Sequence, residues 1–409
     1  MKSEDITWAP LVPLIGGFPL GAERALGKLP EAILSFTDFA GNDAQYVNYM
    51  QETRGLDVPY IQLDNEDHRE MLNAVGDIDI IVGTPPCAAL SQLNTGKSDK
   101  VKGASCEKNR YMTWIFEAGI KRFNAKVIII ENAPTLYTNK GKPFADKLEA
   151  MAREHDYSFT LYKTSTSLHG VPQNRERTFA IMWQAKHAPM LEWYKRESKN
   201  FGDYLKEVPK DAVNNDIVIF PKLLDDPWYN FIKHYTQKDP QDVLKENSKH
   251  YITCFNYILQ QNLVETALDW FKKSKNEKGI KLAEHAIMKF SKGLGIWDGS
   301  VHVFGDKMNA CIGRNMNDTI HPFKERSMTV REAFHMMAFP HDFELIGGRK
   351  NINLIAQNVP VCTAKDIVLQ AKKFCLGELA FTNENITRQN NIAQRLDQGT
   401  FGATLTEFL

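Results

Sequence analysis

The sequence lacks paired cysteines, long apolar runs and an excess of either charge. Its six cysteines show no CxxC and no paired spacing, so neither a zinc site nor a disulfide framework is suggested. No stretch approaches the roughly 18 apolar residues of a membrane span, and the charged first ten residues do not resemble a signal peptide. This cysteine usage fits a reducing compartment. We therefore expect an intracellular, cytoplasmic protein that binds no metal and no membrane.

The 50 basic and 50 acidic residues cancel, so any binding of nucleic acid has to use a local patch. With 409 residues, 43% of them hydrophobic and 24% charged, the composition is that of a globular chain. A chain of this length is expected to form two domains.

Up to about residue 185, apolar runs alternate with amphipathic stretches. Helical patterns such as 42–53 and 109–123 separate most of the runs. This βαβα order predicts an α/β fold with a doubly wound, mostly parallel sheet. The candidate strands are 32–36, 58–63, 79–83, 126–131, 159–164 and 178–183.

From about 186 to 325 the βα rhythm is absent, and helix-like and strand-like patterns return after it. The last stretch, 377–409, is rich in Asn, Gln and Thr and is typical of a loose extension. We predict a first domain of residues 1–185 plus 326–376, a smaller inserted domain of 186–325, and a C-terminal extension of 377–409. Within the insertion, residues 272–292 hold seven lysines and two glutamates. Such a run is either a solvated helix face or a stripe that contacts nucleic acid.

The segment GTPPCAALSQ, residues 83–92, follows an apolar run that is typical of a buried parallel strand. Pro85 and Pro86 cannot continue the ladder of hydrogen bonds, so the chain leaves the sheet at its carboxyl edge. That edge is where open α/β sheets bind ligands. Cys87 is placed there as a nucleophile would be, although a lone cysteine in a loop is also compatible with a buried structural thiol.

Two other segments carry polar residues to strand ends. Glu131 ends the run VIIIENAP, and in VPQNRERTF an extended chain puts Gln173, Arg175 and Arg177 on one face. A thiol, a carboxyl and a guanidinium at one edge suit nucleophilic attack on an electron-poor ring. We expect a neighbouring cation to lower the pKa of the Cys87 thiol. Each group alone also fits a structural role, as a helix cap or a surface ion pair.

Together these segments resemble the DNA cytosine-5 methyltransferases, which carry a Pro-Cys nucleophile, a Glu-Asn-Val tripeptide and a Gln-x-Arg-x-Arg run. The similarity covers most of residues 11–185 and 326–374 in the family's order, including an Arg-Glu…Phe-Pro stretch at 331–340. It implies a Rossmann-like catalytic domain, S-adenosylmethionine as the cofactor, and a target-recognition domain at 186–325. Double-stranded DNA is the implied partner of a monomeric enzyme with a role in restriction–modification.

The resemblance also implies residue roles. Cys87 would add to carbon 6 of a flipped-out cytosine, Glu131 would bond the ring nitrogen and amino group, Arg177 would hold the ring carbonyl and Arg175 would support the pocket. The implied cofactor residues are Ile15, Gly16, Gly17, Asp38, Phe39, Asp64, Pro86, Gln357 and Val359. The implied nucleic-acid contacts are Ser91, Gln173, Lys272, Lys273 and Lys275.

Departures from the family pattern lie mainly on the cofactor side. In the loop VPLIGG, Val12 stands where the family has phenylalanine and Leu14 where it has its first glycine. Ala356–Gln357 replaces a Gly-Asn pair. Three alternatives therefore stay open: a transfer-RNA cytosine-5 methyltransferase, a DNA-binding module with impaired cofactor binding, and transfer of another group from a modified sulfonium donor.

Overall fold

The computed structural model describes residues 2–91, 103–217, 225–249, 251–294, 296, 300–306, 309–310, 319–324 and 326–393. The chain divides into two compact units. Unit 1 comprises Met1–Ser198, Phe334–Ile346 and Gln357–Leu409, and unit 2 comprises Lys199–Ala333 and Gly347–Ala356.

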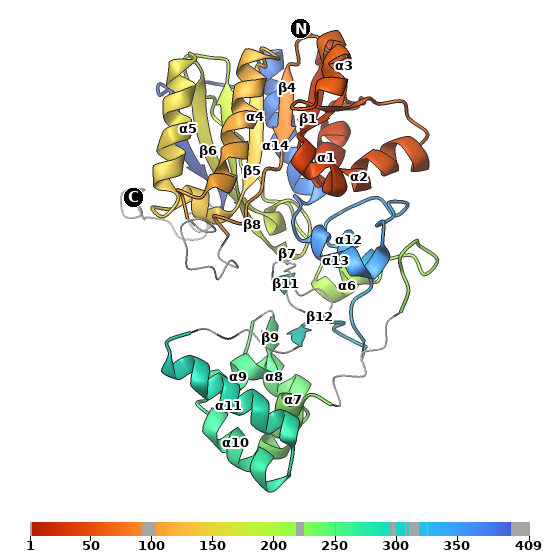
Figure 1. Ribbon diagram of the computed structural model, residues 1–409, viewed down its shortest axis with the longest axis vertical. Coiled ribbons are helices and arrows are strands. Elements are labelled where there is room, and N and C mark those ends of the chain that lie inside the picture. Colours follow the sequence, from red (N-terminus) through yellow and green to blue (C-terminus); the bar gives the residue numbers. More distant parts are fainter. Residues whose placement is uncertain are drawn as a thin grey trace. The chain divides into compact units, whose positions relative to one another are not determined.

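Unit 1 is built on a sheet that contains eight strands within the described residues (Figure 1). Neighbouring strands are parallel except at β8, which runs antiparallel to both of its neighbours. The predicted doubly wound, mostly parallel α/β sheet is therefore confirmed. In spatial order the strands are β13 (Ile386–Asn390), β6 (Ser158–Ser165), β8 (Glu176–Trp183), β5 (Val127–Asn132), β4 (Ile80–Gly83), β1 (Trp8–Leu11), β2 (Ile33–Ser35) and β3 (Tyr60–Gln62).

Helices cover both faces of this sheet, because its central strands are apolar on both sides (Figure 1). On one face α4 and α5 pack over β4, β5 and β6 through residues such as Ile115 and Leu148. On the other face α1 and α14 pack against each other and against β1, β4 and β5. The helices of unit 1 are α1 (Gly17–Leu26), α2 (Ala40–Asn48), α3 (Arg69–Ala74), α4 (Arg110–Lys121), α5 (Lys142–Glu154) and α14 (Val361–Leu376).

Two strands of the sheet in unit 1, β1 and β13, were not predicted from the sequence. β1 contains Pro10, which argues against a central strand because proline cannot donate to the ladder. β13 lies in the stretch predicted as a loose extension, and it pairs in parallel with β6 from Ile386 to Asn390. The prediction of a loose extension is therefore wrong for the residues of β13. The polar side chains of β13 suit an edge strand that is only partly buried. Residues 394–409 of the predicted extension lie outside the described residues.

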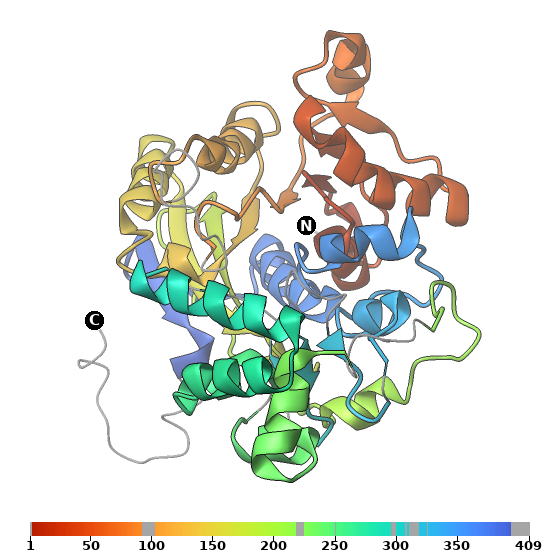
Figure 2. The same cartoon turned by 60° about the horizontal axis from the view of Figure 1, so that its bottom comes forward.

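Unit 2 is mainly helical, which the sequence did not predict: the absence of a βα rhythm indicated only that the pattern of the first domain stops there. The core of unit 2 joins five of the described helices and includes aromatic contacts, with the ring of Trp228 5.1 Å from that of Phe255 and 5.4 Å from that of Phe271. Helices α10 and α11 pack side by side (Figures 1 and 2). The helices are α6 (Phe201–Leu205), α7 (Pro227–Thr236), α8 (Pro240–Glu246), α9 (Cys254–Gln260), α10 (Val264–Lys273), α11 (Glu277–Ser291) and α13 (Ile352–Ile355).

Three strands form a small sheet in unit 2, in the order β12 (Thr319–Ile320), β10 (Val301–Val303), β9 (Tyr251–Thr253). The helix α12 (Val330–His335) begins in unit 2 and ends in unit 1. The remaining strands are β7 (Gln173–Asn174) and β11 (Asn309–Ala310). Within the described ranges, none of the helices combines the length and the apolar composition that crossing a membrane needs.

Candidate active site

Cys87 lies just beyond the carboxyl end of β4, where the chain leaves the sheet. β4 ends at Gly83, Pro85 and Pro86 carry the chain outward, and Cys87 starts a turn in which its carbonyl accepts from the Leu90 N–H at 3.1 Å. Cys87 is partly buried. The prolines therefore end the strand and deliver the thiol to the sheet edge.

Glu131 and Arg177 reach the same edge from β5, which lies next to β4, and from β8, which lies next to β5. Glu131 is the second-to-last residue of β5, and Arg177 is the second residue of the antiparallel β8, so both lie at one end of the paired strands. Arg177 Nε lies 2.6 Å from Glu131 Oε1 in an ion pair that is almost fully buried. The two strand ends thus place a carboxyl and a guanidinium in contact.

The side chains of Gln173 and Arg175 point into unit 1, on the opposite side of the chain from Asn174, as the predicted alternation requires. Both side chains are buried while Asn174 between them is exposed. Gln173 Nε2 donates to the Met336 carbonyl at 2.7 Å, and Arg175 Nη2 donates to the Asn358 carbonyl at 2.9 Å. The Arg175 side chain therefore ties this segment to Asn358, and the Gln173 amide, predicted to contact nucleic acid, is held inside unit 1.

Charges at this edge act on one another. Burial raises the pKa of the Cys87 thiol, the charge of Glu131 raises it further, and Arg177 and Arg175 offset part of the rise. The expected lowering by neighbouring cations is present, but burial outweighs the two arginines, so the pKa of the thiol is raised overall. Burial also raises the pKa of Glu131 above that of an ordinary carboxyl, and the same arginines again oppose the rise. The four side chains thus form one electrostatic cluster in which burial and the two arginines act in opposite directions on the pKa of both Cys87 and Glu131.

The loop after β1 leads into α1. Gly16 has a φ of +104° and caps the helix, and a Cβ on Gly17 would lie 2.1 Å from the Val359 carbonyl oxygen. Both positions therefore require glycine, one for its backbone angle and the other for a close approach. Val359 and Ile15, two further predicted cofactor residues, are buried.

The two predicted acids follow β2 and β3. The Asp38 side chain is 62% exposed, it accepts a hydrogen bond from the Tyr111 hydroxyl, and Arg110 Nη2 lies 3.9 Å from its Oδ2. The ring of Phe39 lies 4.7 Å from that of Tyr111. Asp64 is exposed and accepts from the N–H and hydroxyl of Thr37, both at 2.8 Å. The acids are thus at the predicted edge, although each also has a local structural partner.

The other predicted residues are more widely distributed. Gln357 is exposed, whereas Pro86 and Ser91 are partly buried. Lys272 and Lys273 end α10 in unit 2, Lys275 follows it, and all three are exposed. They belong to the unit that does not contain Cys87.

Asn358 is a site residue that sequence reasoning missed. Its side-chain Oδ1 accepts from the Gly17 N–H at 3.2 Å while its carbonyl accepts from Arg175. One residue therefore links the start of α1 to Arg175. The signal available was its position between Gln357 and Val359, both of which were already selected.

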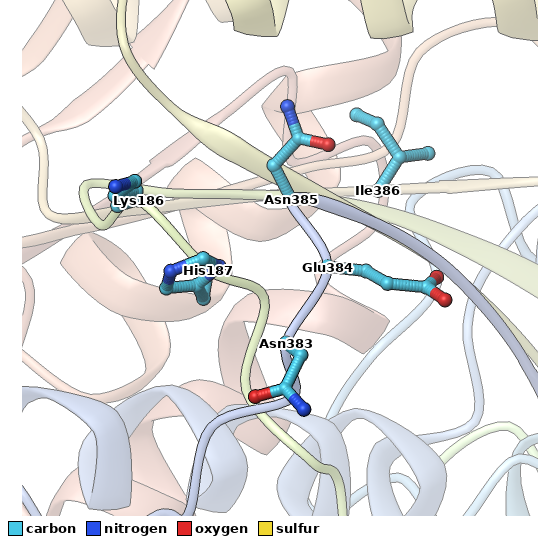
Figure 3. Close-up of a pocket in the computed structure, with 6 residues that line it drawn as sticks. All are labelled: Lys186, His187, Asn383, Glu384, Asn385 and Ile386. Atoms are coloured by element: carbon cyan, nitrogen blue, oxygen red, sulfur yellow. The ribbon is translucent and has the colours of Figure 1, made fainter.

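A pocket of about 460 Å³ lies elsewhere on unit 1 (Figure 3). It is lined by Lys186, His187 and the residues around the start of β13, which Figure 3 shows on two neighbouring segments. By the register of β5, β8 and β6, this is the amino edge of the parallel strands, opposite Cys87. Across the described residues, no three His, Cys, Asp or Glu side chains gather as a metal site would require.

Comparisons with known proteins agree with this geometry. The family model described as C-5 cytosine-specific DNA methylase matches residues 9–373. The chain is 24% identical over 299 residues to the type II methyltransferase M.Bpa9945I of Bacillus paralicheniformis, covering 66% of this chain and 65% of that protein. It is 24% identical over 305 residues to the type II methyltransferase M.AplI of Arthrospira platensis, covering 72% and 68%. The chain thus spans about two thirds of the length of these relatives.

Solved structures show the same fold. A candidate DNA modification methyltransferase encoded within an E. coli prophage matches with a TM-score of 0.56 at 17% identity, covering 91% of this chain and all of that chain. The Entamoeba histolytica methyltransferase EhMeth matches with a TM-score of 0.55 at 13% identity, covering 91% and 98%.

Proposed function

The chain belongs to the C-5 cytosine-specific DNA methylase family, and we propose that it transfers a methyl group from S-adenosylmethionine to carbon 5 of cytosine in DNA. The observation that carries this proposal is the meeting of Cys87, Glu131 and Arg177 at one edge of the sheet, just beyond the carboxyl end of β4, at the carboxyl end of β5 and at the start of the antiparallel β8. Those three groups are what addition to a cytosine ring needs. Bisulfite sequencing of DNA from cells that express the protein tests it, and unmodified cytosine throughout would contradict it.

The chemistry begins with Cys87. Its thiolate adds to carbon 6 of the ring, the carbon 5–carbon 6 double bond opens, and electron density reaches carbon 5 and the ring nitrogen. Glu131 gives its proton to that nitrogen, which its raised pKa favours. Arg177 holds the ring carbonyl oxygen as negative charge develops there. Once carbon 5 carries the methyl group, water takes the carbon 5 proton and the electron pair of that bond restores the double bond. The sulfur of Cys87 leaves as a thiolate, and the ring nitrogen returns its proton to Glu131.

In a duplex this ring is stacked and paired. The target base therefore has to swing out of the helix, at a cost of a few kcal/mol. The turn that follows Pro85 and Pro86 presents Cys87 beyond the sheet edge, where a flipped base can reach it.

The cofactor residues fit a sulfonium nucleoside. The exposed carboxylate of Asp38 suits the ribose hydroxyls, Phe39 offers an aromatic ring, and Asp64 keeps free lone pairs for the adenine amino group. Ile15, Gly16, Gly17, Pro86, Gln357 and Val359 complete the proposed set. When bound, S-adenosylmethionine supplies the electrophilic methyl group.

We expect S-adenosylmethionine to bind more weakly than is usual for the family. Val12 is fully buried and has no aromatic face, and loss of one ring contact is worth about 0.5–1.5 kcal/mol, or several-fold in affinity. Isothermal titration of the whole chain with S-adenosylmethionine and S-adenosylhomocysteine measures this. If neither binds, with or without DNA, the methyl-donor assignment fails and a modified sulfonium donor or a pure DNA-binding role takes its place.

We further propose that residues 186–325 choose the DNA sequence and that the lysines of 272–292 contact phosphates. The α10–α11 pair presents Lys272, Lys273 and Lys275 to solvent. Lysines in such a position add affinity without reading bases. A long recognition segment favours DNA over transfer RNA, since an RNA enzyme need not read a duplex groove.

Replacing Lys272, Lys273 and Lys275 with alanine is expected to weaken binding to all duplexes alike. The slope of log affinity against log salt should fall by about 0.9 for each lysine that contacts a phosphate. Fluorescence anisotropy at several salt concentrations measures both. A triple change of the exposed Lys121, Lys147 and Lys186 in unit 1 removes the same charge and should leave the slope unaltered. A changed site preference with an unchanged slope would mean that the first three lysines read bases instead.

A further inference from the structure

Two residues of the loop between β1 and α1 have backbone angles that their side chains disfavour. Val12 has a φ of +62° and Leu14 a φ of +52°, in the left-handed region that glycine adopts readily. Both side chains are buried in the same apolar cluster as Phe36 and Phe39. The loop thus keeps a glycine-like path at position 14 with a leucine in place, and something has to hold it there.

The group that holds this path is Asp43, on α2. Its Oδ1 accepts from the Leu14 N–H at 3.1 Å. Its Oδ2 accepts from the Tyr60 hydroxyl at 3.2 Å and from the Ser35 hydroxyl. The three donors come from the loop, from β3 and from β2, so one carboxyl joins three segments that surround the predicted cofactor residues.

Asp43 is fully buried, and this is an unfavourable place for a carboxyl. Burial raises its pKa to about 7, and the hydrogen bonds from Ser35, Tyr60 and Leu14 oppose that rise. A carboxyl in such a place is explained by the bonds that it accepts. At the other end of the loop, Gly17 is fixed by Asn358. The loop is therefore anchored at both ends, by Asp43 at position 14 and by Asn358 at position 17.

We propose that Asp43 is a positioning residue for the sulfonium donor: its carboxyl keeps Leu14 in the left-handed conformation and so sets the backbone path of residues 12–17 at the start of α1. This inference rests on the proposed function, because the donor binds at that loop. Asp43 itself acts through the loop backbone. It compensates for the glycine that Leu14 replaces.

The test is a double-mutant cycle on the full chain, read as the dissociation constants of S-adenosylmethionine and S-adenosylhomocysteine. Asp43→Ala is expected to weaken the binding of both compounds by at least about 10-fold, since it removes the hydrogen bond that the Leu14 amide donates to the Asp43 carboxyl. Asp43→Asn keeps an acceptor for Leu14 and should lose less than Asp43→Ala. In the Leu14→Gly background, Asp43→Ala should weaken binding by less than about 3-fold, because glycine adopts the left-handed angle without strain.

Controls separate positioning from general stability. Tyr60→Phe removes one donor to Asp43 but leaves the Leu14 contact, so it should lower the melting temperature more than the donor affinity. Affinity for duplex DNA should be unchanged in every variant. Should Asp43→Ala not fold, Asp43→Ser replaces it in the cycle, since its shorter side chain keeps a hydroxyl but draws back from the Leu14 amide.

The outcomes distinguish the two proposals. If the wild type binds neither compound, the proposed donor fails and this inference falls with it. If the wild type binds and Asp43→Ala binds equally well, only the positioning role is overturned. Equal losses from Asp43→Ala in the Leu14 and Leu14→Gly backgrounds would overturn it too, because Asp43 would then act without regard to the angle at residue 14.

Discussion

Replacing Cys87 with alanine is expected to reduce methylation to less than about 10⁻⁴ of the wild-type rate. The thiolate forms the covalent bond that makes carbon 5 reactive, and no other described side chain in the cluster can replace sulfur. Binding of duplex DNA should change little, since only the covalent step needs the thiol. The rate is measured with labelled S-adenosylmethionine, and DNA binding by anisotropy.

A mechanism-based probe sharpens this test. DNA with 5-fluorocytosine at the target should form a stable adduct with the wild type in the presence of S-adenosylmethionine, because fluorine cannot leave as a proton does. Cys375→Ala, which removes another partly buried thiol from α14, should still form the adduct. An adduct that persists in Cys87→Ala would refute the assignment of the nucleophile.

Replacing Glu131 with glutamine is expected to slow turnover by roughly 10²–10⁴-fold. Glutamine has the same shape and still reaches Arg177, but it has no acidic proton for the ring nitrogen. Glu176→Gln is the matched control: Glu176 lies on β8 beside Arg177, pairs with Lys163 at 2.8 Å and is half-exposed. Its change should leave turnover nearly unaltered. Undiminished turnover of Glu131→Gln at neutral pH would show that Glu131 is structural.

The pH dependence of turnover follows from the same two groups. Cys87 gains thiolate as pH rises toward its raised pKa, so the rate should climb from acidic to neutral pH. Glu131 keeps its proton to a higher pH than an ordinary carboxyl and loses it above its raised pKa, so the rate should then fall. The two groups interact, and the apparent pKa values therefore belong to the pair. Loss of the falling limb in the residual activity of Glu131→Gln would identify Glu131 with that limb.

Most of the sheet could be predicted from local pattern. The runs that became β4 and β5 are apolar on both sides, and this marks central parallel strands wherever they occur. Pro10 hid β1, and the polar composition of residues 386–390 hid β13. Both were missed because their strand pairing comes from neighbours far along the chain, which override local preference.

The features of the candidate site divide in the same way, into those that local sequence predicts and those that depend on distant contacts. The sequence by itself predicted the candidate reacting groups, because Cys87 follows and Glu131 ends an apolar run, and parallel strands bring their carboxyl ends to one edge. The antiparallel pairing of β8, which brings Arg177 to the same edge, is seen only in the structure. The sequence also predicted that Gln173 and Arg175 share one face, since alternation along an extended chain is local; that this face is the buried one is seen only in the structure.

Only the tertiary structure decided the net pKa shift of Cys87, because burial depends on everything packed around the thiol. It alone revealed the bonds of Arg175 and Gly17 to Asn358 and of Leu14 to Asp43. The first two join residues 183 and 341 positions apart, and the third joins α2 to a loop whose backbone angles no sequence pattern specifies. Short motifs therefore predict the reacting groups, whereas the pKa values of those groups and the path of the loop before α1 depend on contacts that exist only after the chain has folded.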